Sequence, residues 1–425
     1  MADHPAPPLK ISERAVVFLV AAVQFTNILD FMMVMPLGPD FAVALGIPAS
    51  KLGMIGGSYT LAAAVSGVVC SFFLDRFDRR KALAVTMLGL AVGTAAGGLA
   101  QGLGSLMLAR VVAGAFGGPA TSLALSIVAD VVPPQRRGKA MGAVMGAFSV
   151  ASVLGVPAGL KLATMGTWRT PFFVVAAVGL LITLLGVFLL PPLRLHLEAR
   201  ARAGTVKDLP LRELLSRPLV QLSYLTGALT MMSGFILIPN ISAYVQFNLG
   251  YPRDHLDELY MYGGIISFLT MRMAGSLVDR FGSARVMAGA TVPYVAVVYA
   301  GFMTTTQAVP VLAVFILFMG VMSFRNVSYN TLASRVPNPA ERARFMSIQS
   351  AVQHLASATG AFASAQMLVE NPDHTLNGMH AVALTSVAMS LALAPMQYLV
   401  ENRVRTRDAK AVLSAPVATA ESAHA

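Results

Sequence analysis

The sequence predicts an all-α integral membrane protein in which twelve transmembrane helices form two six-helix bundles related by an internal repeat. Composition is the first observation: 56% of the 425 residues are hydrophobic, 12% are charged and the mean hydropathy is +0.68, which is too apolar for a water-soluble chain. The apolar stretches are the second. They have the length of helices and lack the short alternating pattern of outer-membrane barrel strands. The third observation is a long-period repeat.

The repeat is clearest in a short charged phrase that occurs twice, 204 residues apart: Leu74, Asp75, Arg76 and Phe77, then Val278, Asp279, Arg280 and Phe281. Three turn-forming residues recur at nearly the same offset: Pro36, Gly46 and Pro48, then Pro239, Gly250 and Pro252. Two similar halves that run in the same direction are typical of one class of secondary transporter.

Twelve apolar stretches are long enough to span a bilayer. We expect spans at 14–46, 49–74, 81–101, 106–131, 139–162, 168–191, 216–248, 257–278, 284–305, 309–334, 344–368 and 377–400. The first and seventh are too long for one straight crossing. The predicted organisation is a cytoplasmic N-terminal segment at 1–13, a bundle at 14–191, a cytoplasmic linker at 192–215, a second bundle at 216–400 and a disordered cytoplasmic tail at 401–425.

Lysine and arginine are distributed unequally between the two sets of loops. The set that includes both termini holds 24 of them, whereas the other set holds four: Lys51, Lys161, Arg169 and Arg253. The positive-inside rule therefore places both termini in the cytoplasm, in a multi-pass protein of the cell inner membrane. The net charge of +11 is mainly this topology pattern, so we expect contact with anionic lipid headgroups and no nucleic-acid partner. We expect a monomer.

Enzyme chemistry has no support in the sequence. Cys70 is the single cysteine, and the seven histidines show no metal-ligand spacing. We find no nucleophile and base pair and no phosphate-binding loop, so we predict no catalytic residues, no metal and no cofactor. An ion or substrate gradient must then drive any active transport.

The repeated loop carries a family motif, Gly-x-Leu-x-Asp-Arg-x-Gly-Arg-Arg. Its first copy matches at Asp75, Arg76, Arg79 and Arg80, and its second at Gly275, Leu277, Asp279, Arg280 and Gly282. On these residues the chain is identified as a member of the major facilitator superfamily, whose twelve-helix pattern it covers almost completely. Each copy preserves residues that the other has lost.

The resemblance implies that these loops act as latches between the two halves. Asp75 is expected to meet the start of the eleventh helix near Phe345, where a carboxylate can cap free N–H groups. Arg76 or Arg79 is expected to pair with Asp130, which ends the fourth helix. Ser334 takes the place of Asp130 in the second half, so the two latches should be unequal. The alternative is that these charges only set topology.

Asp30 is the clear acidic residue inside a span. It follows Arg14 by sixteen residues, about 24 Å along a helix, so it lies well within the membrane. An ionised carboxylate there costs several kcal/mol unless it is paired or hydrated, which favours proton binding. We predict a proton-coupling role. A permanent salt bridge and direct binding of a cationic substrate are the alternatives.

Three arginines inside spans are possible partners of Asp30. Arg110 begins a phrase that resembles the family's fourth-helix motif Arg-x-x-Gln-Gly, with Ala113 in place of Gln. In proton-coupled members that resemblance implies a buried arginine that influences the coupling acid. Arg325 should face the cavity, where it opposes Asp30 or binds an anionic substrate group, or else it bridges helices. Arg272 is either an intramembrane cation of the same kind or a residue that extends to the membrane interface.

The fifth helix bears on the direction of transport. Gly146, Gly155 and Gly159 keep the glycine spacing associated with the family's antiporters. In the family pattern a proline follows the last glycine directly, whereas here Leu160 follows it and the proline is Pro157. Close helix packing is the alternative explanation. The first-helix phrase that contains Asp30 also resembles bacterial drug and sugar exporters of the superfamily.

Polar residues inside the spans outline a substrate cavity: Gln24, Asn27, Tyr59, Asn240, Tyr244, Arg325, Tyr329, Asn330, Gln349 and Gln353. His354 in the eleventh span is a second possible proton site, or a histidine hydrogen-bonded between helices. We predict proton-coupled efflux of a drug-like compound, sugar or small metabolite by alternating access. The alternatives are proton-coupled nutrient import and a non-transporting membrane sensor or scaffold.

Overall fold

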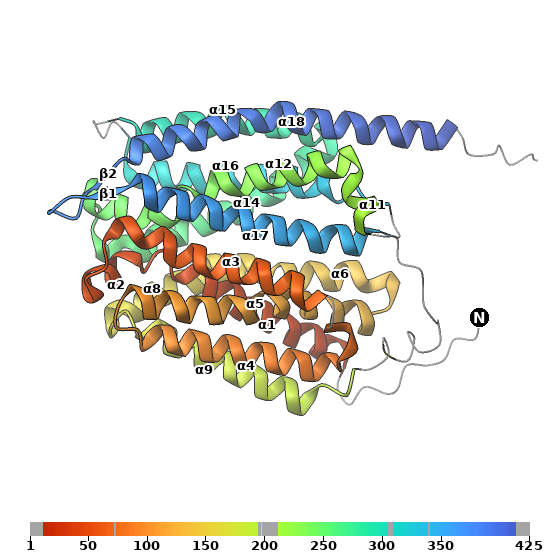
Figure 1. Cartoon of the computed structure of the whole chain (residues 1–425), viewed down its shortest axis with the longest axis horizontal. Coiled ribbons are helices and arrows are strands. Elements are labelled where there is room, and N and C mark those ends of the chain that lie inside the picture. The colour runs from red at the N-terminus through yellow and green to blue at the C-terminus, as the bar shows by residue number, and fades with distance from the viewer. Residues whose placement is uncertain are drawn as a thin grey trace, which may run out of the picture.

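A computed structural model describes residues 12–71, 74–193, 197, 211–304, 309–338 and 341–413, and this part of the chain is almost entirely helical (Figure 1). The first half contains α1 Glu13–Met33, α2 Gly38–Leu45, η1 Ala49–Lys51, α3 Leu52–Ser71, η2 Leu74–Arg76, α4 Arg79–Gly98, α5 Leu103–Val131, α6 Pro134–Met145, α7 Ala147–Val150, η3 Ala151–Gly155, α8 Val156–Met165 and α9 Thr170–Leu189. The elements η3 and η5 are π-helical.

The second half repeats this order. It contains α11 Leu211–Ser216, α12 Pro218–Phe235, η4 Ile238–Asn240, α13 Ile241–Ala243, η5 Tyr244–Asn248, η6 Arg253–His255, α14 Leu256–Phe281, α15 Ser283–Phe302, α16 Val311–Ala333, α17 Arg342–Met367, β1 Val369–Glu370, β2 Leu376–Asn377 and α18 Met379–Leu413. The two short strands pair antiparallel, with Val369 opposite Asn377.

Twelve membrane-length segments are present in the described chain. Eleven are both long and apolar enough to cross a bilayer by composition. The twelfth is α17, which is 26 residues long but rich in serine and glutamine. It packs along α3 and α12, and Gln349, Ser357 and Ser364 are buried in the molecule. The predicted all-α fold of twelve transmembrane helices is confirmed.

The first and seventh spans are interrupted, as their length predicts. Helix α1 ends at Met33, and a turn that contains Pro36 leads into α2. In the second half, α12 ends at Phe235 and Pro239 lies in the short helix η4. Proline lacks the N–H that would continue the helix, so each long apolar stretch bends at the repeated proline.

The helices form two groups that lie side by side, one from α1 to α9 and the other from α11 to α18 (Figure 1). We call them the N-bundle and the C-bundle. Helix α1 begins and α18 finishes at the same end of the molecule, which we call the basic end because Arg79, Arg136 and Arg335 lie there. The other end, where α8 finishes and α14 begins, is called the opposite end.

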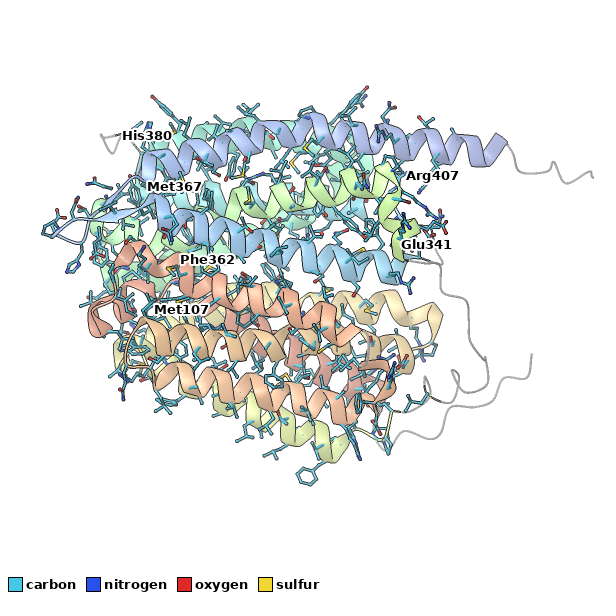
Figure 2. The ribbon with its side chains drawn as sticks, viewed as in Figure 1. Met107, Glu341, Phe362, Met367, His380 and Arg407 are labelled. Atoms are coloured by element: carbon cyan, nitrogen blue, oxygen red, sulfur yellow. The ribbon has the colours of Figure 1, made fainter. Side chains whose placement is uncertain are left out.

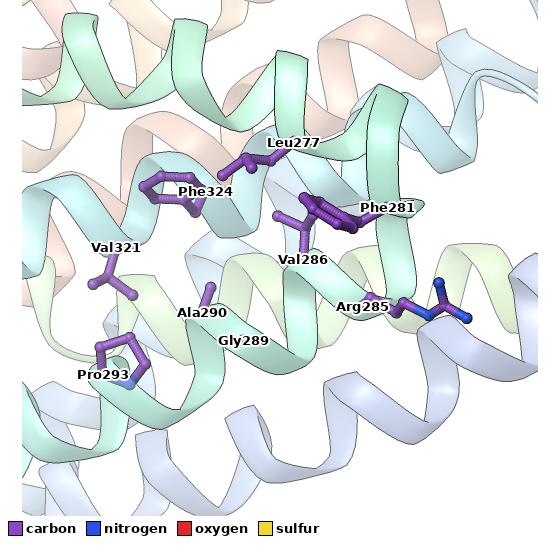
Figure 3. Close-up of a pocket in the computed structure, with 9 residues that line it drawn as sticks. All are labelled: Leu277, Phe281, Arg285, Val286, Gly289, Ala290, Pro293, Val321 and Phe324. Atoms are coloured by element: carbon purple, nitrogen blue, oxygen red, sulfur yellow. The ribbon is translucent and has the colours of Figure 1, made fainter.

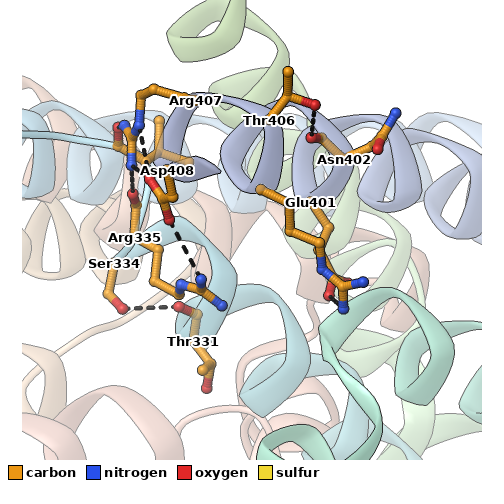
Figure 4. A network of polar contacts seen from close by, with 10 residues as sticks. Thr331, Ser334, Arg335, Glu401, Asn402, Thr406, Arg407 and Asp408 are labelled. Carbon is orange, nitrogen blue, oxygen red and sulfur yellow. Dashed lines mark hydrogen bonds and ion pairs between the residues drawn. The ribbon is translucent and has the colours of Figure 1, made fainter. Parts of the chain in front are cut away.

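The last helix corrects one expectation. A disordered tail was predicted from Glu401, but α18 continues as a helix to Leu413. The reason is packing: Val404 is fully buried, Glu401 accepts a hydrogen bond from the backbone N–H of Ala284, and Arg407 donates to the carbonyl oxygens of Arg335 and Val336 (Figure 4). Contacts with α15 and α16 therefore hold the extension against the bundle.

Candidate functional site

Asp30 forms a buried ion pair with Arg110 in the N-bundle. The two carboxylate oxygens accept hydrogen bonds from Nη1 and Nη2 of Arg110, each at 2.9 Å, and Thr94 Oγ1 donates to Oδ1 at 2.7 Å. The side chains of Asp30 and Arg110 are 0% and 1% exposed. Three helices, α1, α4 and α5, thus meet at one carboxylate. Of the three arginines named as possible partners, Arg110 is the one in contact.

A second layer of polar contacts surrounds this pair. The Arg110 guanidinium lies 4.6 Å from the centre of the Tyr59 ring, and the Tyr59 hydroxyl donates to Asn27 Oδ1 at 2.8 Å. Asn27 in turn donates to Thr121 Oγ1 and to the carbonyl oxygen of Gly117. A side chain at Gly117 would overlap both Asn27 and Tyr59, so the network needs glycine there. The sequence analysis named Asn27 and Tyr59, and the structure joins them to Asp30.

The buried carboxylate of Asp30 needs a compensating charge in this apolar surrounding. A bidentate pair with Arg110 compensates the buried carboxylate, which would otherwise be very unfavourable in the membrane. The same pair gives the buried Arg110 guanidinium its counter-charge and links α1 to α5. Thr94 was not predicted as a site residue. A threonine in an apolar helix carries no sequence signal that distinguishes a ligand of Asp30 from a packing residue.

Arg325 lies in the C-bundle and does not meet Asp30. It is fully buried on α16, where Nη2 donates to Ser233 Oγ at 2.7 Å and to Ser390 Oγ at 3.1 Å, and the guanidinium stacks 4.0 Å from the centre of the Tyr294 ring. By the offset of the repeated prolines, Ser233 is the counterpart of Asp30. The two halves therefore place a different residue at equivalent positions, an acid in the first and a serine in the second.

The other predicted cavity residues are not gathered around Asp30. Asn240 hydrogen-bonds Ser364 Oγ at 2.9 Å, and the Tyr244 ring packs 5.3 Å from Phe302, both inside the C-bundle. Asn330 is exposed. The remaining four are Gln24, Tyr329, Gln349 and Gln353; the first three are buried and each keeps a polar side-chain atom without a partner, whereas Gln353 is half-buried.

His354 is half-buried on α17, and its ring has no hydrogen-bond partner in the described part of the chain. Its proposed proton role stays a prediction. Arg272 is exposed, and its guanidinium stacks 4.5 Å from the ring centre of Phe268, so it does not lie with the buried polar groups.

The fifth span is irregular at its glycines. Gly146 ends α6, the π-helical turn η3 ends at Gly155, and Pro157 follows in the first turn of α8. A side chain at Gly155 would press against Leu29 of α1, next to Asp30, whereas Gly159 has more room. The proline and the π-turn give this span a bend beside the helix that bears the buried carboxylate.

The repeated loops differ between the halves. Arg79 Nε pairs with Asp130 at 2.5 Å, Arg80 donates to the carbonyl oxygen of Leu190, and Arg76 is exposed. The side chain of Asp75, and with it the expected contact near Phe345, lies outside the described residues.

In the second copy, Gly282 adopts φ +88°, which favours glycine, beside Glu401 of α18. Asp279 and Arg280 are exposed, and an added Cβ at Gly275 would meet no atom within 4 Å. The latch roles of both loops stay predictions.

A further ion cluster joins helices within the C-bundle at the basic end. Arg217, at the start of α12, donates to Glu341 Oε2 at 2.8 Å and to Glu213 Oε1 at 3.1 Å. These hydrogen bonds raise the pKa of Arg217 above its usual value. The cluster ties the start of α12 to the residue before α17.

Close contacts between the bundles gather toward the opposite end. Helix α3 of the N-bundle packs directly on α17, and a Cβ at Gly53 would overlap the carbonyl oxygen of Ala361. Four residues further along α3, a Cβ at Gly57 would lie 3.1 Å from the Phe362 ring, which Figure 2 shows at the boundary between the bundles. The two glycines let the helix backbones approach closely, as in other membrane helix pairs.

Polar contacts also join the two bundles at the opposite end. Arg253 Nε and Nη2 donate to the two carboxylate oxygens of Asp40, each at 2.7 Å, across the bundle boundary. The backbone N–H of Ala49 donates to Glu370 beside them. At the opposite end, the two halves are therefore held together by helix packing and by a bidentate ion pair.

Loss of the Asp40 carboxylate should loosen this closure modestly. Both side chains of the pair are about a fifth exposed, so we expect Asp40→Asn to shift the ratio of closed to open molecules about two- to fivefold. Spin labels on Thr164→Cys and Glu258→Cys, exposed positions on α8 and α14, measure the separation in a Cys70→Ala background. The double variant Asp40→Asn with Arg253→Gln should shift the closed-to-open ratio little more than Asp40→Asn alone. If the shifts of the two single variants added up in the double variant, the two residues would act independently.

Two repeated six-helix bundles with interrupted helices are the architecture of one class of secondary membrane transporters. The chain belongs to the Major Facilitator Superfamily, whose family model matches residues 20–361.

The chain is also similar in sequence to several transport proteins. The chain is 28% identical over 380 residues to the chloramphenicol resistance protein of Streptomyces lividans, a match that covers 88% of this chain and 93% of the relative. It is 22% identical to multidrug resistance protein 2 of Bacillus subtilis, covering 69% and 76%. It is 26% identical to a probable sugar efflux transporter of Helicobacter pylori, covering 61% and 65%.

Solved structures show the same fold. A bacterial homologue of the human lysosomal transporter Spinster, in an inward-facing conformation, aligns with a TM-score of 0.70 at 16% identity, covering 93% of this chain and 98% of that one. A D-xylose–proton symporter aligns with a TM-score of 0.68 at 19% identity, covering 91% and 98%.

Proposed function

We propose that this transporter exports a drug-like compound, sugar or small metabolite from the cytoplasm in exchange for protons, with Asp30 as the coupling carboxylate. The observation that carries the proposal is the fully buried Asp30, which is held by Arg110 and Thr94 at the junction of α1, α4 and α5. A group at this position experiences the membrane potential and can link its protonation to helix movement.

The basic end faces the cytoplasm in this proposal, because lysine and arginine are concentrated there. The molecule is then closed on the outside by the α3–α17 contact and by the pair of Asp40 and Arg253. In this state, substrate enters from the cytoplasm. Release requires the outside contacts to separate and the basic end to close.

Coupling follows from the charge of the Asp30 site. A proton that arrives from outside neutralises Asp30, and Arg110 then loses its charge partner. Return of the proton to the cytoplasm restores the pair. Substrate and proton occupy the protein in alternating half-cycles, so inward proton flow drives outward substrate flow. One charge that crosses 100 mV supplies about 2.3 kcal/mol, which is enough for a concentration ratio of roughly fifty.

The resistance and efflux names of the three relatives support export. Proton-coupled import is the second candidate, since the same carboxylate would serve a symporter. A membrane sensor or scaffold is the third, and it has no need for a buried acid.

Inverted membrane vesicles that contain a pH-sensitive dye test the proposal. We expect addition of a transported compound to dissipate an imposed proton gradient in the wild type, and Asp30→Asn to reduce this response about tenfold or more. Glu13→Gln, on the same helix but near the basic end, is the matched control and should behave as the wild type. Drugs, sugars and metabolites are screened in parallel.

Three outcomes would contradict the export proposal. Equal responses of wild type and Asp30→Asn would remove Asp30 from coupling. Proton movement in the same direction as substrate would establish symport. A normal cellular function in Asp30→Asn, without any compound-dependent proton flux in the wild type, would favour the scaffold. Size-exclusion profiles of each variant confirm that the protein is folded.

A further inference from the structure

An apolar groove runs along the outer wall of the C-bundle, between α14, α15 and α16 (Figure 3). Its volume is about 390 Å³, and its walls are Leu277 and Phe281 of α14, Val286, Gly289, Ala290 and Pro293 of α15, and Val321 and Phe324 of α16, with Arg285 at one end. Helix α15 packs against α14, α16 and α18, all in the C-bundle. The groove therefore belongs to the outer surface of this bundle and is separate from the network around Asp30.

Gly289 lines the groove and leaves this part of it without a side chain. At the equivalent place in the first half, the Phe116 ring fills the space beside Gly89, and Val85 lies one turn earlier. By the 204-residue offset, the counterparts of Phe116 and Val85 are Gly320 and Gly289. A Cβ added at Gly289 would meet no atom within 4 Å. The first half therefore has side chains, Val85 and Phe116, where the second half has two glycines.

The charges near the groove are concentrated at its basic end. Arg285 is exposed and forms no ion pair with a described residue, and the Arg280 guanidinium lies 5.1 Å from the ring centre of Phe281, which lines the groove. Asp279 is the acid beside them. Glu401, on neighbouring α18, is already engaged by Arg405 and by the backbone of Ala284. The local charge is net positive.

We propose that this groove binds one anionic phospholipid, with an acyl chain against the apolar walls and the phosphate on Arg285. Arg285 and Pro293 are eight residues apart on α15, so the groove extends about 12 Å from the charged end into the hydrocarbon region. That geometry matches a lipid, in which a charged headgroup lies at the membrane surface and its chain lies beneath it. Each buried methylene group favours binding, and the basic residue selects an anionic headgroup.

Native mass spectrometry of the full chain in mild detergent tests this site. Phosphatidylglycerol and phosphatidylcholine with identical acyl chains are titrated against the delipidated protein. We expect the first phosphatidylglycerol to bind about fivefold more tightly than the first phosphatidylcholine, the preference that one basic residue provides. Arg285→Gln should remove the preference. Gly289→Leu, whose side chain would enter the groove, should weaken binding of both lipids.

Two matched controls give the test its specificity. Arg14→Gln removes an exposed charge from the basic end of the N-bundle, and Ala288→Leu adds the same side chain to α15 beside the groove; both should bind lipid as the wild type does. Equal binding of the two lipids by the wild type would overturn the proposal, as would an equal loss in Arg14→Gln. A dimer that Gly289→Leu dissociates would identify a second copy of the chain as the occupant instead.

Discussion

Gly53→Val is expected to reduce transport about tenfold or more while the protein stays folded. A side chain at this position overlaps the backbone carbonyl oxygen of Ala361, which cannot rotate away as a side chain could. Overpacking of this kind costs about 1–3 kcal/mol. A shift of only about 1.4 kcal/mol changes a conformational ratio tenfold, so the ratio of closed to open molecules would fall about tenfold or more.

The spin-label pair on Thr164→Cys and Glu258→Cys separates this explanation from unfolding. In Gly53→Val the label distance should lengthen, because the bundles move apart at the opposite end. Gly67→Val is the matched control: it lies on the same helix, and a Cβ there meets no atom within 4 Å. An unchanged distance in Gly53→Val, or an equal loss of transport in Gly67→Val, would show that the α3–α17 contact does not limit the transport cycle.

Asp30→Asn should also destabilise the protein by about 3–5 kcal/mol, since it leaves the buried Arg110 without a counter-charge. The pair is 0% and 1% exposed, so water cannot replace the lost carboxylate. Thermal unfolding in detergent, followed by circular dichroism, measures the effect. The double variant Asp30→Asn with Arg110→Gln should recover part of the loss, because the uncompensated charge is gone.

The exposed pair of Glu13 and Arg136 provides the comparison. Its side chains are 28% and 66% exposed, so Glu13→Gln should change stability by less than about 1 kcal/mol. If Asp30→Asn and Glu13→Gln proved equally mild, the ion pair of Asp30 and Arg110 would not hold α1 against α5.

The predictions also show which parts of the site a sequence can supply. Asp30 and Arg110 were identifiable because charged residues in apolar helices are rare and expensive. Arg325 met the same criterion, but the sequence placed no partner beside it. Its contacts with Ser233 and Ser390 depend on which helix faces pack together within the C-bundle.

Other features had no sequence signal. Thr94, the third group on Asp30, is one of many threonines in apolar helices. The ion pair of Asp40 and Arg253 joins the short helices α2 and η6, and the two residues are 213 apart in the chain. Residues 401–413 resemble a polar tail in composition, and their helix depends on Val404 and Glu401 finding partners on the rest of the C-bundle.

By itself, the sequence determined the membrane class, the twelve helices, the two-fold repeat, the breaks at Pro36 and Pro239, and the buried acid. These properties follow from local composition, periodicity and the cost of a charge in lipid, so they can be read along the chain. Tertiary structure alone decided that Asp30 meets Arg110, that Gly53 touches α17 and that Gly289 lines a groove. The reason is physical: these contacts join helix faces that are far apart in the chain, and only packing brings them together.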